Sequence, residues 1–202
     1  AQAGWLGDRF RVIRYDTRGH GASDTPEGPY AFDDLADDVL AVMDAFGVDR
    51  ADYMGLSLGG MTGLGVALKA PDRVNRLIVA AARADAPEPF VKSWDDRVAK
   101  IRAGGMEAIW PGTLERWLTP AFQSAEPEAV ATLRAQFLDT RVDGYAGCAA
   151  ALKRLDYLRH LGGLSVPTLY VAGAEDMGAP AAAMEEMAAT TPGAGYICIP
   201  DA

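Results

Sequence analysis

Short apolar runs alternate with helical patterns along much of this chain, and that alternation constrains the fold more than any other feature. Apolar residues at helical spacing predict helices over 31–46, 58–70 and about 179–190. The runs expected to form strands are residues 11–16, 51–56, 76–82, 166–172 and 195–199. Strands that alternate with helices predict an α/β fold, with a mostly parallel sheet flanked by helices.

Residues 84 to about 160 interrupt the alternation. They contain helical patterns over 90–103, 106–118, 126–138 and 144–160 and no convincing strand. We interpret this block as a helical cap inserted into the α/β core. The predicted organisation is therefore 1–83, the first part of the core; 84–160, the cap; and 161–202, the second part of the core. A series of ordinary crossover helices is the alternative.

Composition excludes several classes of protein. The 202 residues include 19 Lys and Arg against 28 Asp and Glu, a formal charge of −9. Nucleic acids and anionic membrane surfaces attract basic proteins, so neither is an expected partner. No run approaches the roughly 18 apolar residues of a membrane span. The two cysteines, Cys148 and Cys198, do not suggest a disulfide framework or a structural zinc site.

The strongest chemical signal is the segment Gly55-Leu-Ser-Leu-Gly59, which fits G-x-S-x-G between an expected strand and an expected helix. This context is typical of a nucleophile elbow, in which Ser57 occupies a tight turn with positive φ. Gly55 and Gly59 would suit positions that crowd each other. The N–H of Leu58, at the start of the helix, would point to a developing oxyanion. The alternative is that this segment is simply the Gly-rich start of a helix, with no catalytic role.

A nucleophilic serine needs a base that an acid orients. In this architecture the acid follows a later strand. The strand at 166–172 leads into a loop with Asp176, our candidate acid; adjacent Glu175 is the alternative. The non-catalytic alternative is that these residues belong to an acidic loop exposed to solvent.

The base is expected after the strand at 195–199, but only Pro200-Asp-Ala202 follows. The histidines of the chain are His20 and His160; His20 would shape its loop, and His160 would act as a cation at a helix end. A second oxyanion donor from an earlier strand is also missing. We therefore expect these 202 residues to be an internal fragment that is inactive by itself.

Several motifs resemble the α/β-hydrolase superfamily, and within it the 3-oxoadipate enol-lactonases. The superfamily motifs are Phe10-Arg-Val-Ile-Arg-Tyr-Asp-Thr-Arg-Gly-His-Gly-Ala-Ser-Asp24, Gly28-Pro-Tyr30 and Gly55-Leu-Ser-Leu-Gly-Gly-Met61. Motifs that fit the enol-lactonases are Arg102-Ala-Gly-Gly-Met106, Leu114-Glu-Arg-Trp-Leu-Thr-Pro-Ala-Phe122, Glu126-Pro-Glu128, Asp143-Gly-Tyr145 and Val166-Pro-Thr-Leu169.

The resemblance implies an α/β-hydrolase fold with Ser57 as nucleophile, Asp176 as acid and Leu58 as an oxyanion donor. It also implies a histidine shortly after the Asp-Ala that ends this chain. Trp117, beside Arg116, matches a cap tryptophan that faces the active site in the enol-lactonases. A tryptophan of the cap core is the other interpretation of Trp117.

The expected function is hydrolysis of a small ester or lactone, with 3-oxoadipate enol-lactone of aromatic catabolism as the expected substrate. A cationic group such as Arg116 would then bind the anionic substrate. We expect a cytoplasmic enzyme without cofactor or metal. The alternatives are a general carboxylesterase, a C–C bond hydrolase or a perhydrolase. A non-catalytic binding protein that lacks the base is the alternative of another class.

Overall fold

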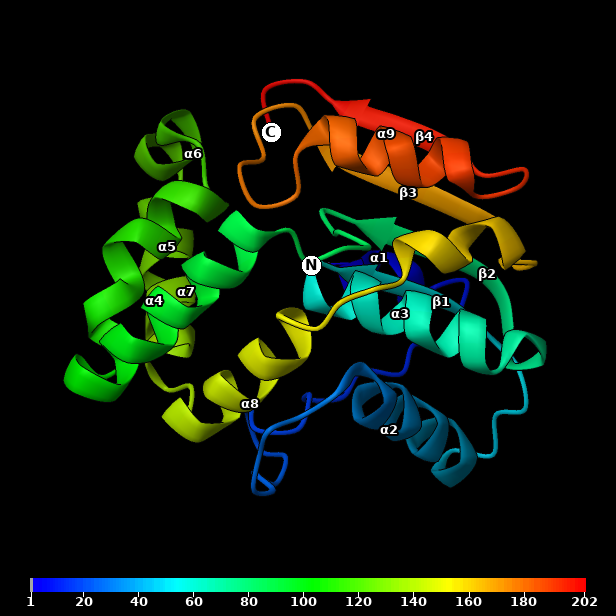
Figure 1. Ribbon diagram of the computed structural model, residues 1–202, viewed down its shortest axis with the longest axis horizontal. Coiled ribbons are helices and arrows are strands. Elements are labelled where there is room, and N and C mark those ends of the chain that lie inside the picture. Colours follow the sequence, from blue (N-terminus) through cyan, green and yellow to red (C-terminus); the bar gives the residue numbers. More distant parts are fainter. Residues whose placement is uncertain (1) are drawn as a thin grey trace.

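One parallel sheet of four strands organises the molecule, in the order β1-β2-β3-β4. The computed structural model describes residues 2–202. In order, the strands are β1 (Ala51–Leu56), β2 (Val74–Ala80), β3 (Thr168–Gly173) and β4 (Gly195–Ile199). Four of the five predicted strands are thereby confirmed. Because all four strands are parallel, their carboxyl ends share one edge of the sheet (Figure 1).

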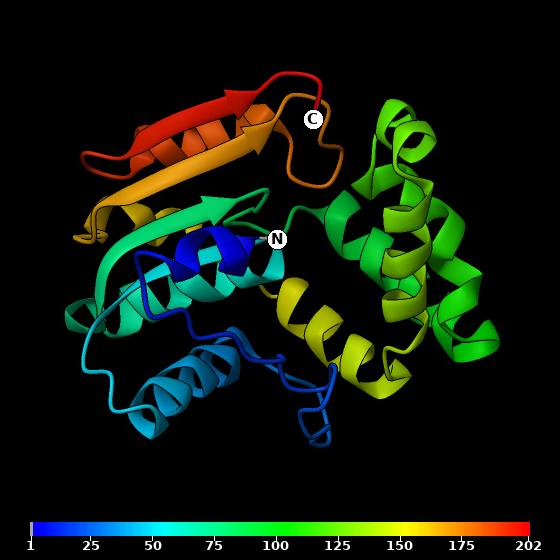
Figure 2. The same cartoon turned by 180° about the vertical axis from the view of Figure 1, so that it is seen from behind.

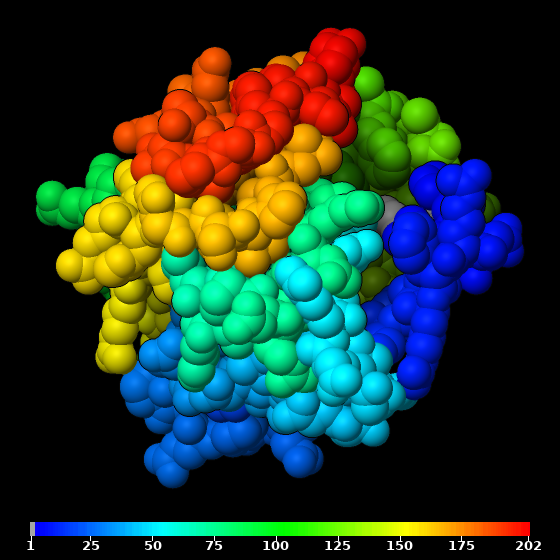
Figure 3. All heavy atoms as spheres, turned by 90° about the vertical axis from the view of Figure 1, so that its right-hand side faces the viewer, coloured from blue at the N-terminus to red at the C-terminus, as the bar shows by residue number. Residues whose placement is uncertain are grey.

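The prediction of a strand over residues 11–16 is wrong. This segment has no regular secondary structure, and β1 pairs with β2 alone in the part of the chain that the structure describes. Val12 and Tyr15 are 37% and 36% exposed. Residues that favour strands form a strand only when they can hydrogen-bond to a neighbouring strand. In the described structure this segment has no such neighbour. Figure 3 shows the N-terminal segment, in blue, at one side of the molecule.

Helices lie on both faces of the sheet (Figures 1 and 2). On one face are α3 and α9, with α2 packed against α3, and on the other is α1. Their bounds are α1 (Gln2–Gly7), α2 (Phe32–Ala45), α3 (Leu58–Lys69) and α9 (Ala181–Thr190). A short 3-10 helix, η1 (Pro71–Arg73), connects α3 to β2. The α/β prediction is therefore confirmed.

Close packing explains why α3 is rich in glycine. A Cβ added at Gly63 would stand 2.6 Å from Cε1 of the Tyr53 ring on β1. No side chain fits in that space, so glycine lets the helix approach the strand. The helix that follows Ser57 is thus fixed tightly against β1 and β2.

A second group of helices lies beyond the carboxyl edge of the sheet (Figures 1 and 2). It comprises α4 (Glu88–Gly104), η2 (Met106–Ile109), α5 (Trp110–Trp117), α6 (Pro120–Ala125), α7 (Pro127–Leu138) and α8 (Val142–Leu152). These helices have a small core of their own, formed by Ile101, Met106, Ile109, Trp110 and Phe137. We call residues 88–152 the helical block.

The helical block departs from the sequence prediction in three places. The helix expected over 106–118 begins with the 3-10 turn η2. The helix expected over 144–160 ends at Leu152, and a separate 3-10 helix, η3 (Leu158–Gly163), leads back to β3. The unpredicted helix α6 starts at Pro120, and Thr119 caps it by accepting a hydrogen bond from the Phe122 N–H at 3.3 Å.

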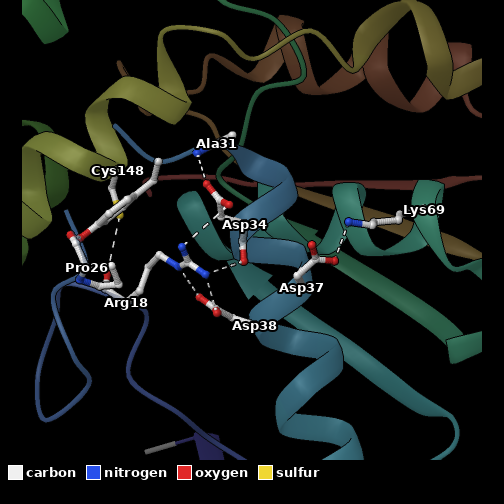
Figure 4. Close-up of polar contacts among 9 residues, drawn as sticks. Arg18, Pro26, Ala31, Asp34, Asp37, Asp38, Lys69 and Cys148 are labelled. Atoms are coloured by element: carbon white, nitrogen blue, oxygen red, sulfur yellow. Dashed lines mark hydrogen bonds and ion pairs between the residues drawn. The ribbon is translucent and has the colours of Figure 1, made fainter. Parts of the chain in front are cut away.

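The loop between residues 16 and 31 is tied to α2 by Arg18. Its guanidinium donates hydrogen bonds to both carboxylate oxygens of Asp38, at 2.6 and 2.7 Å (Figure 4). On its other side the loop contacts α8 so closely that a Cβ on Gly19 would stand 2.4 Å from Cα of Gly144. The loop therefore links the core to the helical block.

No helix within residues 2–202 combines the length and the apolar character that crossing a membrane requires.

Candidate active site

The peptide turns sharply at Ser57, the residue between β1 and α3. Its φ is 50° and its ψ is −116°, a backbone conformation that L-amino acids rarely adopt. The Ser57 N–H donates a hydrogen bond to the Ala80 carbonyl at 2.8 Å, which ties the turn to the neighbouring strand. The Ser57 side chain is exposed at the carboxyl edge of the sheet. The predicted strand–turn–helix context is confirmed.

The two glycines of the motif play unequal roles. A Cβ on Gly55 would lie 2.2 Å from the carbonyl carbon of Gly59, so only glycine fits at position 55. A Cβ on Gly59 would meet no atom within 4 Å. The expectation that the two positions crowd each other is confirmed at Gly55, where an added Cβ would meet the Gly59 backbone. At Gly59 an added Cβ would point into open space, so crowding does not restrict that position to glycine.

Leu58 is the first residue of α3. A residue at this position has no carbonyl four residues earlier within its own helix, so its N–H is free for another acceptor. The positive end of the helix dipole lies at the same place. The arrangement can therefore stabilise negative charge next to the Ser57 hydroxyl.

Asp176 lies in the loop after β3, at the same edge of the sheet as Ser57. Its Oδ1 accepts hydrogen bonds from the N–H groups of Gly178, at 2.7 Å, and Ala179, at 2.9 Å. The side chain of Asp176 is half-buried, whereas that of Glu175 is exposed. The Glu175 N–H donates to the Ala202 carbonyl at 2.7 Å. The residues after β4 thus lie beside the loop that carries Asp176.

Neither histidine forms a hydrogen bond with Ser57. His20 lies in the loop that Arg18 anchors, and its Nδ1 is 3.2 Å from the Arg18 carbonyl oxygen. His160 is exposed in η3. Between residues 2 and 202 the structure thus brings no histidine into a hydrogen-bonded triad with Ser57 and Asp176.

Trp117 and Arg116 lie at the end of α5, in the helical block. The Trp117 side chain is 53% exposed, and its ring packs edge-on against Phe137, with centroids 5.5 Å apart. Arg116 donates a hydrogen bond from Nη2 to Oγ1 of Thr113 at 3.1 Å. Burial lowers the pKa of Arg116, and the nearby positive charge of Arg97 lowers it further.

The sequence motifs did not single out Arg97 or Trp94, and they included Tyr145 only as part of Asp143-Gly-Tyr145. Arg97 and Tyr145 are near enough to Arg116 to affect its pKa, and the Arg97 guanidinium stacks on the Trp94 ring. The available signal was weak: Arg97 and Arg116 both lack an acidic residue three or four positions away on their helices. Elsewhere in residues 2–202, no group of three or more His, Cys, Asp or Glu side chains is arranged to bind a metal ion.

Known proteins share both the sequence and the architecture of this chain. It is 39% identical over 175 residues to 3-oxoadipate enol-lactonase 2 of Acinetobacter baylyi, covering 87% of this chain and 65% of that relative. The chain therefore spans slightly less than two thirds of that relative's length.

Two solved structures superpose well. The enol-lactonase from Burkholderia xenovorans LB400 matches with a TM-score of 0.94 and 37% identity, over 98% of this chain and 75% of that one. A thermophilic esterase from Thermogutta terrifontis, solved with malate bound, matches with a TM-score of 0.92 and 30% identity, over 99% of this chain and 75% of that one.

The family model for the alpha/beta hydrolase fold matches residues 4–202. Together with the elbow at Ser57 and the parallel sheet, these similarities show that the chain belongs to the alpha/beta hydrolase family and is similar to 3-oxoadipate enol-lactonases.

Proposed function

We propose that this protein is a serine hydrolase of a small ester or lactone, with Ser57 as its nucleophile. The observation that carries the proposal is the turn at Ser57, with its positive φ and its exposed side chain at the carboxyl edge of the sheet. A strained strand-to-helix turn raises the hydroxyl above the sheet, where a substrate can reach it.

The proposed reaction is acyl transfer in two steps. A histidine base takes the proton of the Ser57 hydroxyl while Oγ attacks the carbonyl carbon, and the Leu58 N–H stabilises the resulting oxyanion. The C–O bond to the leaving group then breaks, and that oxygen receives the proton. Water then attacks the acyl-enzyme with the help of the same histidine base and oxyanion donor, which releases the acid product and restores Ser57. Asp176 orients the base; we assign the role of base to neither His20 nor His160.

For the substrate we propose 3-oxoadipate enol-lactone, which places the enzyme in the breakdown of aromatic compounds. The enol-lactonases that the chain resembles support this choice. The substrate carries a carboxylate, and Arg116 supplies a cation in the helical block despite the overall charge of −9. The related esterase solved with malate supports binding of a small carboxylate.

We further propose that residues 84–160 form a cap over the site, and that 1–83 and 161–202 form the core. In open α/β sheets ligands bind at the carboxyl ends of the strands, and this is the edge that the helical block faces (Figure 2). Two free cysteines are consistent with action in the cytoplasm, where disulfides are rare.

The test is hydrolysis of 3-oxoadipate enol-lactone by the purified full-length protein, compared with hydrolysis of p-nitrophenyl acetate. Activity on both, abolished by Ser57→Ala, supports the whole proposal. Activity on the neutral ester without activity on the lactone would rule out the lactonase assignment. The remaining alternatives would then be a carboxylesterase, a C–C bond hydrolase or a perhydrolase of the same fold. Activity on none of these substrates favours a binding protein.

A further inference from the structure

The helical block joins the core through two chain segments that lie side by side. Residues 83–86 lead from β2 towards α4, and residues 155–158 lead from α8 into η3 (Figure 1). The Ala84 carbonyl accepts hydrogen bonds from the Tyr157 N–H, at 2.7 Å, and the Leu158 N–H, at 2.8 Å. We call these two segments the stem of the block. Because its two chains are bonded to each other, the stem limits how the block can move relative to the core.

The stem begins beside the Ser57 turn. The Ala80 carbonyl, at the end of β2, accepts the hydrogen bond from the Ser57 N–H. The next residue, Ala81, has a φ of 46°, which L-amino acids rarely adopt, and its N–H donates to the Val171 carbonyl of β3 at 2.9 Å. Arg83 lies two residues further along the chain. The backbone between the Ser57 turn and Arg83 is therefore short and fixed to the sheet.

Arg83 connects the stem to the start of α4. Its side chain is only 13% exposed, and its Nη2 donates a hydrogen bond to Oδ1 of Asp85 at 2.9 Å. The guanidinium carbon lies 5.5 Å from the ring centroid of Phe90, a favourable contact between a cation and an aromatic face. The Arg83 Nε is buried and has no hydrogen-bond partner within the described residues, which costs free energy. Folding alone would thus not favour an arginine at this position.

Phe90 extends this contact across the block. Its ring packs edge-on against Trp94, with centroids 6.0 Å apart, and Trp94 packs against Tyr145 of α8, with centroids 5.7 Å apart. The helices α4 and α8 are the two that connect the block to the core. Because Arg83 contacts the aromatic group that joins these helices, its position affects both attachments of the block.

Two acidic residues face each other in the stem. Asp85 and Asp156 pair in an antiparallel bridge, and like charges opposite each other on neighbouring strands repel. Each carboxylate has an arginine partner: Arg83 for Asp85, at 2.9 Å, and Arg159 for Asp156, at 2.7 Å. The Arg159 side chain is 68% exposed, so water screens its ion pair. The ion pair of the buried Arg83 is screened less and contributes more to the stem.

We propose that Arg83 is a positioning residue that fixes the helical block over Ser57. It acts by neutralising Asp85 in the stem and by holding Phe90 at the start of α4. The inference rests on the proposed function, in which the core supplies the nucleophile and the block supplies the substrate pocket. Arg83 acts on the placement of that pocket and is assigned no role in the reaction itself.

Hydrogen–deuterium exchange of the full-length protein tests the placement without requiring turnover. In Arg83→Met, the amides of residues 84–90 and 155–158 should exchange about tenfold faster or more, because these segments open more often once the contacts with Asp85 and Phe90 are lost. Exchange in the strands of the sheet should not change. Arg83→Lys should recover part of the loss, since an ammonium restores the charge but lacks the planar fork.

Arg159→Met is the matched control. It removes the arginine of the exposed ion pair on the other chain of the stem, changes the net charge equally, and should speed exchange less than about twofold. Equal acceleration in Arg83→Met and Arg159→Met, or faster exchange that extends through the whole sheet, would overturn the inference. If Arg83→Met does not fold, Phe90→Leu removes the aromatic face that Arg83 contacts and should give the same local acceleration.

Ester hydrolysis by the same variants shows whether this placement matters for the reaction. In Arg83→Met the KM for p-nitrophenyl butyrate should rise by about threefold or more while kcat stays within about twofold, because the block supplies binding contacts and the core supplies the reacting groups. Faster local exchange without a rise in KM would leave Arg83 with a role in stability alone and overturn the positioning role. If esters are hydrolysed but exchange in the stem does not depend on Arg83, the inference is wrong and the hydrolase stands. If no ester is hydrolysed, the hydrolase proposal fails, and the exchange comparison still decides whether Arg83 holds the block.

Discussion

Gly55 and Gly59 approach so closely across the Ser57 turn that a Cβ on Gly55 would lie 2.2 Å from the Gly59 carbonyl carbon. Gly55→Ala should therefore force the backbone of the turn apart and destabilise the protein by about 1–3 kcal/mol, the usual cost of overpacking. Gly59→Ala is the matched control. Its Cβ enters open space and alanine favours a helix, so stability should stay level or rise slightly. Denaturant unfolding measures both, and equal destabilisation would contradict the geometry.

Asp176 should matter for its charge more than for its shape. Its Oδ1 accepts two backbone hydrogen bonds, which an asparagine oxygen can also accept, so Asp176→Asn should keep the loop. If its charge orients the base, as we propose, Asp176→Asn should lower kcat on p-nitrophenyl acetate on the order of 10³-fold or more. Glu175→Gln, at the exposed neighbouring position, should lose far less. A larger loss in Glu175→Gln would transfer the role of the acid to Glu175.

The ion pair between Arg18 and Asp38 should contribute more stability than the nearby pair between Lys69 and Asp37 (Figure 4). Arg18 forms a bidentate contact, stacks near the Tyr30 ring and holds the loop on α2. Arg18→Met should lower Tm by roughly 5 °C, the equivalent of about 2 kcal/mol. Lys69→Met should change Tm little, because its pair is exposed to solvent. If thermal unfolding shows the same fall in Tm for Arg18→Met and Lys69→Met, Arg18 does not anchor the loop.

Trp117 should affect substrate binding more than folding. Its side chain is 53% exposed, and only one side of it packs on Phe137. If it lines the pocket, Trp117→Ala should reduce kcat/KM for the enol-lactone by about ten- to a hundredfold, the scale of one lost pocket contact. Phe122→Ala, which removes another exposed aromatic ring of the helical block, serves as the control. A large fall in Tm without a specific loss of kcat/KM would make Trp117 a residue of the cap core instead.

Local pattern was enough to predict most of the sheet and the Ser57 turn. The strands at 51–56 and 195–199 have the predicted bounds, because apolar runs and the residues that end them are local signals. Residues 11–16 look like a strand locally, yet a strand also needs a neighbour, which no local pattern reveals. The open space at Gly59 is likewise set by neighbouring elements.

The cluster around Arg97 shows the same limit in the candidate site. Arg97 and Arg116 lie on different helices, α4 and α5, yet the charge of Arg97 is near enough to lower the pKa of Arg116. Their positions in sequence give no sign of that proximity. The roles of Ser57 and Asp176, by contrast, could be proposed from motif and strand order alone, because the carboxyl ends of parallel strands share one edge.

Covalent labelling of the nucleophile tests the central claim most directly. A fluorophosphonate reacts with the activated serine of a serine hydrolase, and trypsin releases residues 51–69, in which Ser57 is the only serine. In the full-length protein, mass spectrometry should find one adduct, on Ser57, that disappears in Ser57→Ala and persists in His20→Ala and His160→Ala. An adduct on another residue, or hydrolysis of p-nitrophenyl acetate that survives Ser57→Ala, would contradict the account.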